Sequence, residues 1–344
     1  MKIMNEAKYI SPTTNGSPLD PATGLSGRRI TRFSPPPFAH IPVMVESVTE
    51  IFSTVPSGLI LDATIGGGGH SLEILKSRED LNVIGIDQDS EALAAADSNL
   101  VGFANRVSLI HGRFDDLSAV AKQIGNQKLS GFLFDLGVSS YQLDNPHRGF
   151  SFRNDGPLDM RMNPDSQITA GEYVNGATEE ELASLLYNYG DEKYSKRVAR
   201  AIVSMRPILG TKELADIICD AIPARSKRSP GHPARRSFQA LRIAVNCEIE
   251  ILESSIREAI RLLKIGGRGV VLSYHSGEDK VVKRTLRQLA GLDISNSKYH
   301  PEVHQQKKIS LLARKAQRAS SDEISKNPRA SSALLRKFEK VSDL

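Results

Sequence analysis

The sequence has only two cysteines, Cys219 and Cys247, among its 344 residues. Two thiols cannot form a disulfide framework or a four-ligand zinc site, so we expect neither disulfide scaffolding nor a metal. No run reaches the roughly 20 apolar residues that a membrane-spanning helix needs, and the N-terminus lacks a hydrophobic signal core. We therefore expect a reduced, cytoplasmic protein with no membrane partner.

The composition is that of a globular protein, with 40% hydrophobic and 25% charged residues. Residues 1–37 are rich in proline and poor in apolar side chains, which predicts a disordered leader. The net charge of +5 is unevenly placed: residues 193–242 carry 12 Lys/Arg against 3 Asp/Glu, and residues 298–344 carry 11 against 5. Such asymmetry favours a phosphate-rich partner, although solvated basic surfaces would give the same pattern.

Five short apolar runs predict buried strands that alternate with helices. The expected strands are residues 59–62, 83–87, 107–110, 131–135 and 269–274, and the first helices are residues 71–76 and 90–100, the latter with Ser90 as N-cap. Strands separated by helices at this interval are typical of a parallel, doubly wound α/β sheet of the Rossmann-like kind.

The alternation stops for more than a hundred residues after the fourth strand. A turn-rich stretch, residues 137–162, precedes helical patterns over residues 179–189, 193–204 and 211–221, and a long helix is expected from Ser237 to Leu263. We therefore expect a discontinuous sheet domain, residues 38–147 and 247–344, interrupted by an all-helical domain at residues 148–246.

The segment from Leu59 to Asp89 carries the clearest functional signal. Its run Asp62-Ala-Thr-Ile-Gly-Gly-Gly-Gly-His70 joins a strand to a helix, where glycines let a ligand approach the backbone and the helix N-terminus. Asp87 ends the next strand, about 20 residues on, where a carboxylate accepts hydrogen bonds from ribose hydroxyls. The third glycine of the dinucleotide fingerprint is missing, which favours S-adenosylmethionine and leaves an NAD-dependent oxidoreductase as the alternative.

Three further residues fall near this pocket by topology. Phe114 follows the third strand, where its ring would cover the adenine or fill the core. Asp135 ends the fourth strand, at the carboxyl edge where open α/β sheets bind ligands. Gln142, in the next loop, could bond to cofactor or substrate.

Several longer motifs point to one family. They are His40–Met44, Asp62–His70, Asp135–Asp144, Arg148–Arg153, Asp155–Met162, Tyr189–Glu192, Thr211–Leu214, His232–Arg235, Phe238–Ile243 and Ser273–Ser276. Over roughly residues 40–340 the chain resembles the bacterial small-subunit rRNA cytosine-N4 methyltransferases, the RsmH (MraW) family.

The resemblance implies a class I S-adenosylmethionine-dependent methyltransferase sheet with an inserted helical domain. It implies methylation of N4 of a cytidine in the decoding centre of 16S rRNA, within the small ribosomal subunit. The sequence does not determine whether the protein forms a homodimer. The implied cofactor contacts are Gly68, Gly69, His70, Asp87, Phe114, Asp135 and Gln142. A DNA cytosine-N4 methyltransferase would share the chemistry, but it normally carries a Ser-Pro-Pro-Tyr-like motif where this chain has Asp135-Leu-Gly-Val.

A cytosine amine is a poor nucleophile because its lone pair is delocalised into the ring. The site must therefore accept hydrogen bonds from the N–H groups, and we expect Asp135 to do so, with His275 as a second catalytic candidate. A base in rRNA must also leave its stack to be methylated. The basic and aromatic residues expected to hold the RNA are Arg148, Phe150, Phe152, Arg153, Lys227, Arg228, Arg235 and Arg236.

Overall fold

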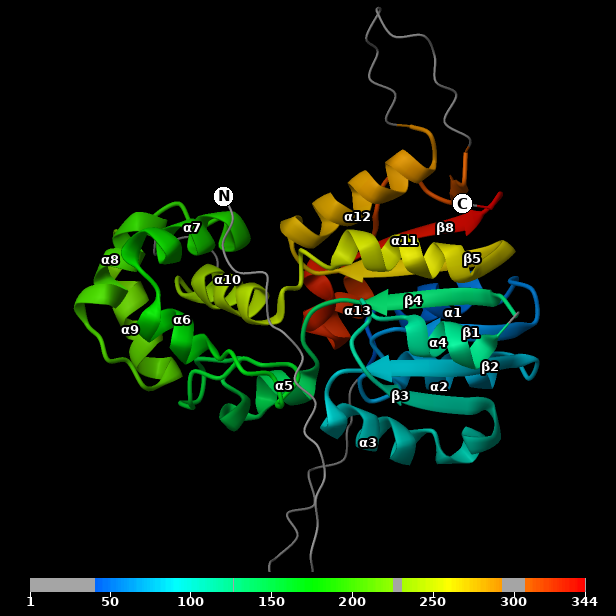
Figure 1. Ribbon diagram of the computed structural model, residues 1–344, viewed down its shortest axis with the longest axis horizontal. Coiled ribbons are helices and arrows are strands. Elements are labelled where there is room, and N and C mark those ends of the chain that lie inside the picture. The colour runs from blue at the N-terminus through cyan, green and yellow to red at the C-terminus, as the bar shows by residue number, and fades with distance from the viewer. Residues whose placement is uncertain (1–40, 126, 225–230, 293–306, 344) are drawn as a thin grey trace, which may run out of the picture. The chain divides into compact units, whose positions relative to one another are not determined.

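The computed structural model describes residues 41–125, 127–224, 231–292 and 307–343, so the predicted leader lies outside the described residues. Figure 1 shows a central sheet flanked by helices, with a second group of helices toward which the arrowheads of β2 and β4 point. The strands are β1 (Gly58–Asp62), β2 (Leu81–Asp87), β3 (Val107–His111), β4 (Leu129–Asp135), β5 (Leu263–Ser273), β6 (Ile309–Leu311), β7 (Gln317–Arg318) and β8 (Leu334–Lys340).

The strand order determines where a ligand can bind. The strands follow the order β3-β2-β1-β4-β5-β8-β6, with β7 paired to β8, and the neighbours among β1–β5 are parallel. The chain leaves β1 toward β2 and β3, then crosses to β4 on the other side of β1. The order therefore reverses between β1 and β4, and the carboxyl ends of these strands form the crevice in which such sheets bind ligands. This arrangement confirms the predicted Rossmann-like fold.

Helices cover both faces of the sheet, and successive strand residues point alternately to one face and the other. One face packs Phe132, Phe134 and Val271 under three helices. The other packs Ile60 and Leu133 under three more. The first set is α4 (Ser118–Ile124), α11 (Leu252–Leu262) and α12 (Ser276–Leu289), and the second is α1 (Val45–Phe52), α2 (Gly69–Ser77) and α3 (Ser90–Asn99).

Sequence patterns did not predict the antiparallel edge of the sheet. Strand β8 pairs antiparallel with β5, and β6 and β7 pair antiparallel with β8. Hydrophobic alternation is obscured in β8 because its last residue, Lys340, is only 1% exposed and donates to the carbonyl of Leu263 at 2.7 Å. The buried apolar residues Leu335 and Phe338 are also three apart and pack on opposite faces of the sheet, so β8 lacks the period of two that would mark a strand.

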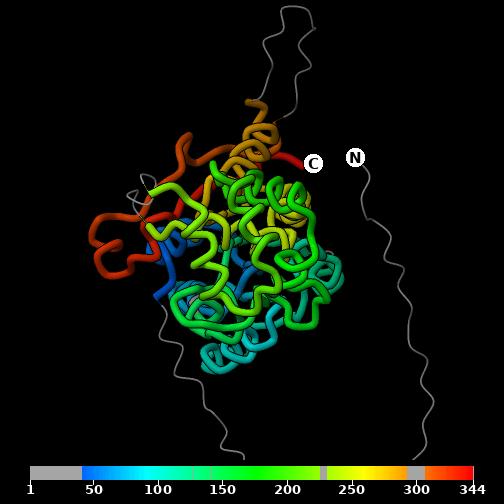
Figure 2. The backbone as a smooth tube through the Cα atoms, turned by 90° about the vertical axis from the view of Figure 1, so that its left-hand side faces the viewer, coloured from blue at the N-terminus to red at the C-terminus, as the bar shows by residue number. Residues whose placement is uncertain are grey.

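A helical segment lies between β4 and β5 in the chain. It comprises α5 (Ser140–Asp144), α6 (Ala170–Gly176), α7 (Glu179–Gly190), α8 (Ser195–Ser204), α9 (Thr211–Ala221) and α10 (Arg235–Asn246), shown in green in the foreground of Figure 2. The last five bury a hydrophobic cluster of their own, with Leu182, Ile202 and Leu241 fully buried. The predicted helices over residues 179–189, 193–204 and 211–221 are confirmed, while the domain boundaries stay a prediction. Within the described residues, no helix has the length and apolar character needed to cross a membrane.

The predicted long helix from Ser237 to Leu263 is wrong. Helix α10 ends at Asn246, Cys247 takes a left-handed conformation with φ 52°, and α11 begins at Leu252. The turn brings the carboxylate of Glu248 to the guanidinium of Arg242. In a straight helix, residues six apart lie on different faces, so the Arg242–Glu248 pair requires the break in the helix. The spacing of hydrophobic residues does not reveal such a break.

Candidate active site

The loop between β1 and α2 is shaped by its glycines. Gly66 and Gly68 have φ of +52° and +79°, a region that residues with a Cβ rarely adopt. A Cβ at Gly69 would lie 2.5 Å from Cγ of Pro42. Gly66, Gly69 and His70 line a cavity at the carboxyl edge of the sheet, whereas Gly68 forms the N-cap of α2 and does not face the cavity. The role of Gly68 is therefore to shape the loop.

Asp87, at the end of β2, is held by backbone N–H groups. Its Oδ2 accepts from Gly66 N at 2.9 Å and its Oδ1 from Asp89 N at 3.0 Å. Burial raises the pKa of Asp87 to about 6, although these hydrogen bonds oppose the shift. Each carboxylate oxygen has a second lone pair, so the ionised group can also accept from two ribose hydroxyls.

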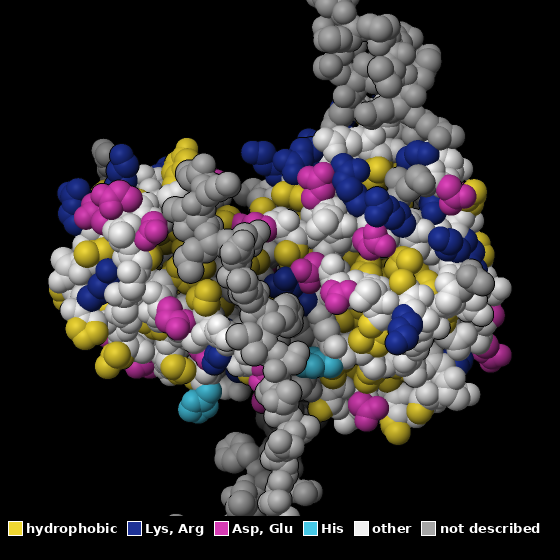
Figure 3. Space-filling model, in the orientation of Figure 1, with side chains coloured by type: hydrophobic (Ala, Val, Ile, Leu, Met, Phe, Trp, Pro, Cys, Tyr) yellow, Lys and Arg dark blue, Asp and Glu magenta, His cyan; other side chains and the backbone are white. Residues whose placement is uncertain are grey.

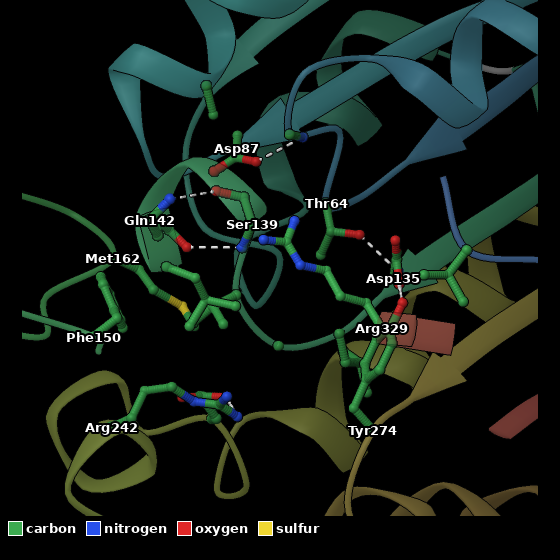
Figure 4. Close-up of a pocket in the computed structure, with 18 of the residues that line it drawn as sticks. Thr64, Asp87, Asp135, Ser139, Gln142, Phe150, Met162, Arg242, Tyr274 and Arg329 are labelled. Carbon is green, nitrogen blue, oxygen red and sulfur yellow. Dashed lines mark hydrogen bonds and ion pairs between the residues drawn. The ribbon is translucent and has the colours of Figure 1, made fainter. Parts of the chain in front are cut away.

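Asp135, at the end of β4, is positioned by three neighbours. Its backbone N donates to Oγ1 of Thr64 at 2.7 Å, and its Oδ1 accepts from the hydroxyl of Tyr274 at 2.6 Å (Figure 4). Its Oδ2 lies 3.4 Å from Nε2 of His70, and the Asp135 side chain is 25% exposed. Burial, followed by the charge of Asp135, raises the pKa of Tyr274 well above its usual value, so Tyr274 stays protonated and remains a donor. The carboxylate is thus fixed in direction but open to the cavity.

The cavity has a volume of about 1000 Å³, which is enough for an adenosine cofactor and a nucleobase together. Figure 4 shows Asp87 on one side of it and Arg242 on the opposite side. Two observations fit an adenosine cofactor on the first side: the open glycine loop, and His70, whose two buried ring nitrogens make no hydrogen bond among the described residues. Asp135 lines the same cavity and lies between these two sides in Figure 4.

Phe114 and Gln142 also line this cavity. The ring of Phe114 packs edge-to-face on Phe134 at 5.4 Å, so it serves the core and the cavity wall at once. Gln142 donates from Nε2 to Asp89 at 2.9 Å and accepts from Ser139 N at 3.0 Å, which ties its loop to the start of α3. Asp89, not Ser90, caps α3, because its carboxylate accepts from Glu91 N.

Arg148 requires a correction, because we predicted that it holds RNA. It is 9% exposed, and its Nη1 lies 2.7 Å from Oδ2 of Asp89. Its Nη2 donates to the carbonyls of Arg161 and Met162, both at 3.0 Å. The guanidinium is therefore directed inward, where it compensates a buried carboxylate and fixes the loop that follows α5.

The neighbouring predicted RNA residues lie differently. Arg153 is exposed and lines the cavity. Phe150 is buried at 7% exposure, and Phe152 stacks on His232 with ring centroids 4.3 Å apart. Both rings line the cavity wall, and their predicted contact with RNA stays a prediction.

The predicted basic residues of the helical segment are only partly brought to the cavity. Arg235 is exposed and lines it, whereas Arg236 is exposed outside it and donates to the carbonyl of Asp191. Lys227 and Arg228 lie outside the described residues. Figure 3 shows Lys and Arg side chains gathered over α11 and α12, a region outside the two basic stretches found in the sequence.

His275 lines the cavity and also caps a helix, so its predicted catalytic role stays a prediction. Its Nδ1 accepts from Glu278 N at 3.3 Å, which makes it the N-cap of α12. Its Nε2 lies 3.0 Å from Oε1 of Glu278, so both ring nitrogens are directed at one residue. Burial acts to raise the pKa of Glu278, but the contact with His275 and the charge of Arg242 bring it below its usual value.

Sequence reasoning missed Tyr274, Arg242 and Glu248 as site residues. Tyr274 and Arg242 lie in the motifs Ser273–Ser276 and Phe238–Ile243, but no spacing signal connects them to Asp135. Glu248 was placed inside the predicted long helix. All three line the cavity, because tertiary packing brings α10 and the start of α12 to the end of β4.

The fold and the site define an α/β protein with a cavity suited to an adenosine cofactor at the switch point of its sheet. The MraW methylase family matches residues 37–341. Ribosomal RNA small subunit methyltransferase H of Heliobacterium modesticaldum is 44% identical over 310 residues, covering 88% of this chain and 99% of its own length. The protein of the same name from Thermobifida fusca is 42% identical over 318 residues, covering 91% and 96%. A solved rRNA methylase structure from Streptococcus thermophilus aligns over 88% of this chain and 100% of its own, with a TM-score of 0.40 and 12% identity, too distant to argue from.

The chain therefore belongs to the MraW methylase family. It is an S-adenosylmethionine-dependent methyltransferase. This confirms the cofactor that the missing third glycine favoured, and the alternative of an NAD-dependent oxidoreductase is wrong.

The pKa of Asp87 predicts how cofactor binding depends on pH. We expect the affinity for S-adenosylhomocysteine to fall about tenfold per pH unit below pH 6, because the protonated carboxyl has lost one acceptor.

The stability of the protein without cofactor should change with pH in the opposite direction. The folded-state pKa values of Asp62 and Asp87 are both raised to about 6, so these groups lower the free energy of unfolding as pH rises from about 4 to 6.

Isothermal titration calorimetry with S-adenosylhomocysteine between about pH 5 and 8 measures the first effect. Asp87→Asn is the control, and its weaker affinity should be independent of pH over this range. A wild-type affinity that stays constant down to about pH 5 would contradict the assignment of Asp87 to the ribose.

The inward position of Arg148 predicts a loss of stability when it is replaced. Arg148→Met leaves the carboxylate of Asp89 buried without its cation and should lower the free energy of unfolding by about 3–5 kcal/mol. Arg153→Met removes an exposed arginine from the same loop and should change it by less than about 0.5 kcal/mol. Urea unfolding measures both free energies, and equal effects of the two substitutions would contradict the role of Arg148 as the buried partner of Asp89.

Proposed function

We propose that this chain transfers the methyl group of S-adenosylmethionine to the exocyclic N4 amine of a cytidine in the decoding centre of 16S rRNA, acting on the small ribosomal subunit in the cytoplasm. The names of its relatives support a small-subunit rRNA substrate. The position of Asp135 carries the proposal, because this carboxylate, whose side chain is 25% exposed, lies between the Asp87 side and the Arg242 side of one cavity (Figure 4).

When bound, S-adenosylmethionine supplies an electrophilic methyl group on its sulfonium sulfur. The protein's own contribution is to position the acceptor and to handle its proton. A hydrogen bond from N4–H to Oδ2 of Asp135 would localise the nitrogen lone pair and direct it toward the methyl group. On gaining the methyl group N4 would release one proton, which Oδ2 of Asp135 would accept.

Tyr274 and Thr64 leave Asp135 little freedom to rotate. With Oδ1 engaged by the hydroxyl of Tyr274, Oδ2 is the oxygen available to a substrate. Such orientation contributes to rate because a misplaced acceptor does not lower the barrier. The orientation of the acceptor should therefore contribute more to the rate of methyl transfer than the basicity of the Asp135 carboxylate.

Arg153 and Arg235 are the described arginines best placed to hold RNA at the cavity. Both are exposed and both line it. Arginines at such a mouth contact phosphates and keep a splayed-out nucleotide in place.

The alternative substrate is a DNA cytosine, which would present the same amine. Such enzymes normally carry a Ser-Pro-Pro-Tyr-like motif, whereas this chain has Asp135-Leu-Gly-Val at the corresponding strand end. The motif difference and the names of the relatives both favour RNA.

Methylation of small subunits that lack the modification, with labelled S-adenosylmethionine, tests the proposed function. We expect N4-methylcytidine at one decoding-centre position, located by nuclease mapping and mass spectrometry. Asp135→Asn should lower kcat by about 100-fold or more, because it removes the proton acceptor, and should change cofactor affinity little.

Asp97→Asn, on the exposed face of α3, is the matched control and should keep wild-type turnover. Labelling of another base or atom would refute the cytosine-N4 assignment. Wild-type turnover by Asp135→Asn would refute the role of Asp135 alone.

The RNA assignment predicts a salt-dependent interaction. Arg153→Gln and Arg235→Gln should each weaken binding to small-subunit rRNA and reduce the slope of log K against log salt by about one, because each removes one phosphate contact. Arg261→Gln, on α11 and outside the cavity lining, should leave the slope unchanged. Filter binding at several salt concentrations measures the slope, and an unchanged slope in both cavity variants would exclude these contacts.

A further inference from the structure

The side of the cavity opposite Asp87 contains an ion-pair cluster that methyl transfer as described above does not use. Arg242 comes from α10, Glu248 from the turn after it and Glu278 from the first turn of α12. Their side chains are 15%, 8% and 2% exposed, and all three line the cavity. Burying this much charge is costly unless the groups are paired and hydrogen-bonded, so each side chain of the cluster is oriented by its partners.

The guanidinium of Arg242 is fixed on one edge and free on another. Its Nε and Nη2 lie 2.8 and 2.9 Å from the two oxygens of Glu248, a side-on bidentate pair. Its Nη2 is 3.8 Å from Oε1 of Glu278, which is an ion pair too long for a hydrogen bond. Among the described residues, the end-on pair of N–H groups on Nη1 and Nη2 therefore has no hydrogen-bond acceptor. A planar fork of two donors is held rigidly at the cavity.

Asp135 supplies a hydrogen-bond acceptor beside the two donors of Arg242, and the three groups together could recognise the edge of a base. Asp135 lines the same cavity, with Oδ1 held by Tyr274 and Oδ2 available (Figure 4). Together the two side chains offer one acceptor and two donors. The pairing edge of guanine has the same order of groups, a carbonyl acceptor followed by two N–H donors, and guanine is the natural complement of cytosine.

We propose that Arg242, oriented by Glu248, recognises the pairing edge of the target cytosine, donating to its N3 and O2 while Asp135 accepts from N4–H. This inference rests on the proposed function and adds the residues that select the base. Uracil would present an N–H donor at N3 and a carbonyl at position 4, so it would face the fork with a donor and Asp135 with an acceptor. The cluster thereby both binds cytosine and rejects uracil.

A cation is the other ligand that these residues suggest by composition. Ligand atoms of Glu248, His275 and Glu278 lie within 4.8 Å of one another. However, both oxygens of Glu248 are already bound by the Arg242 guanidinium. A divalent ion would be placed beside that fixed positive charge, so the cluster is better suited to a neutral base with acceptor atoms.

A combined substitution in enzyme and substrate tests the contact. The substrates are small subunits reconstituted on rRNA with either cytidine or 3-deazacytidine at the target position, the latter having lost the N3 acceptor. The variant is the double substitution Arg242→Met and Glu248→Gln, because methionine has no donor and Arg242→Met alone would leave Glu248 buried without its cation. Thermal unfolding and S-adenosylhomocysteine affinity confirm that the variant folds and holds its cofactor.

We expect the wild-type enzyme to lose kcat/KM on 3-deazacytidine by a factor about tenfold or more larger than the double variant loses, since the variant has no donor at that atom. The altered reactivity of the analogue cancels, because it affects both enzymes. Glu253→Gln with Arg257→Gln removes an ion pair on α11 outside the cavity and should behave as wild type.

Equal losses for wild type and double variant would overturn the role of Arg242 while leaving the proposed function intact. If the wild-type enzyme formed no N4-methylcytidine on the normal substrate, the proposed function would fail, and this inference with it. Tight binding of Mn²⁺ or Zn²⁺ by the isolated wild-type protein, lost in the double variant, would instead identify the cluster as a metal site and overturn the inference.

Discussion

The structure depends on compensation of the carboxylates that the fold gathers at one edge of the sheet. Parallel strands end together, so the acidic residues at or just after the ends of β1, β2 and β4 collect at one edge of the sheet, and each needs a partner when water is excluded. The partners are Ser71 for Asp62, backbone N–H groups for Asp87, Arg148 for Asp89 and Tyr274 for Asp135. The geometry of the cavity follows from how these four charges are satisfied.

The same requirement ties the helical segment to the sheet. Arg148, in the loop after α5, reaches Asp89 at the start of α3, and Arg242 on α10 reaches Glu248 and approaches Glu278 on α12. A local excess of arginine is therefore a poor measure of RNA-binding surface in this chain. Part of it neutralises buried carboxylates, whereas Arg153, Arg235 and Arg329 are exposed and line the cavity.

The two sides of the cavity differ in how they are encoded. The cofactor side comes largely from one continuous stretch, the glycine loop and Asp87, in which glycine conformation and strand-end spacing act locally. The opposite side is assembled from α10, the turn after it and the start of α12. Its residues become neighbours only because the chain breaks at Cys247 and folds back on the sheet.

This difference explains how far sequence reasoning could go. Hydrophobic period, strand-end aspartates and the glycine loop are local signals. They were sufficient for the parallel sheet, most helices and the choice of S-adenosylmethionine, while the cofactor contacts from Asp62 to Asp87 stay a prediction. They failed where a residue is defined by a distant partner. The sequence places Arg148 and His275 in plausible functional motifs, but only tertiary contacts reveal an inward guanidinium and a helix cap. Likewise, Arg242 and Tyr274 have no local mark, because a hydrogen bond to a carboxylate on another element depends on packing that no short pattern records.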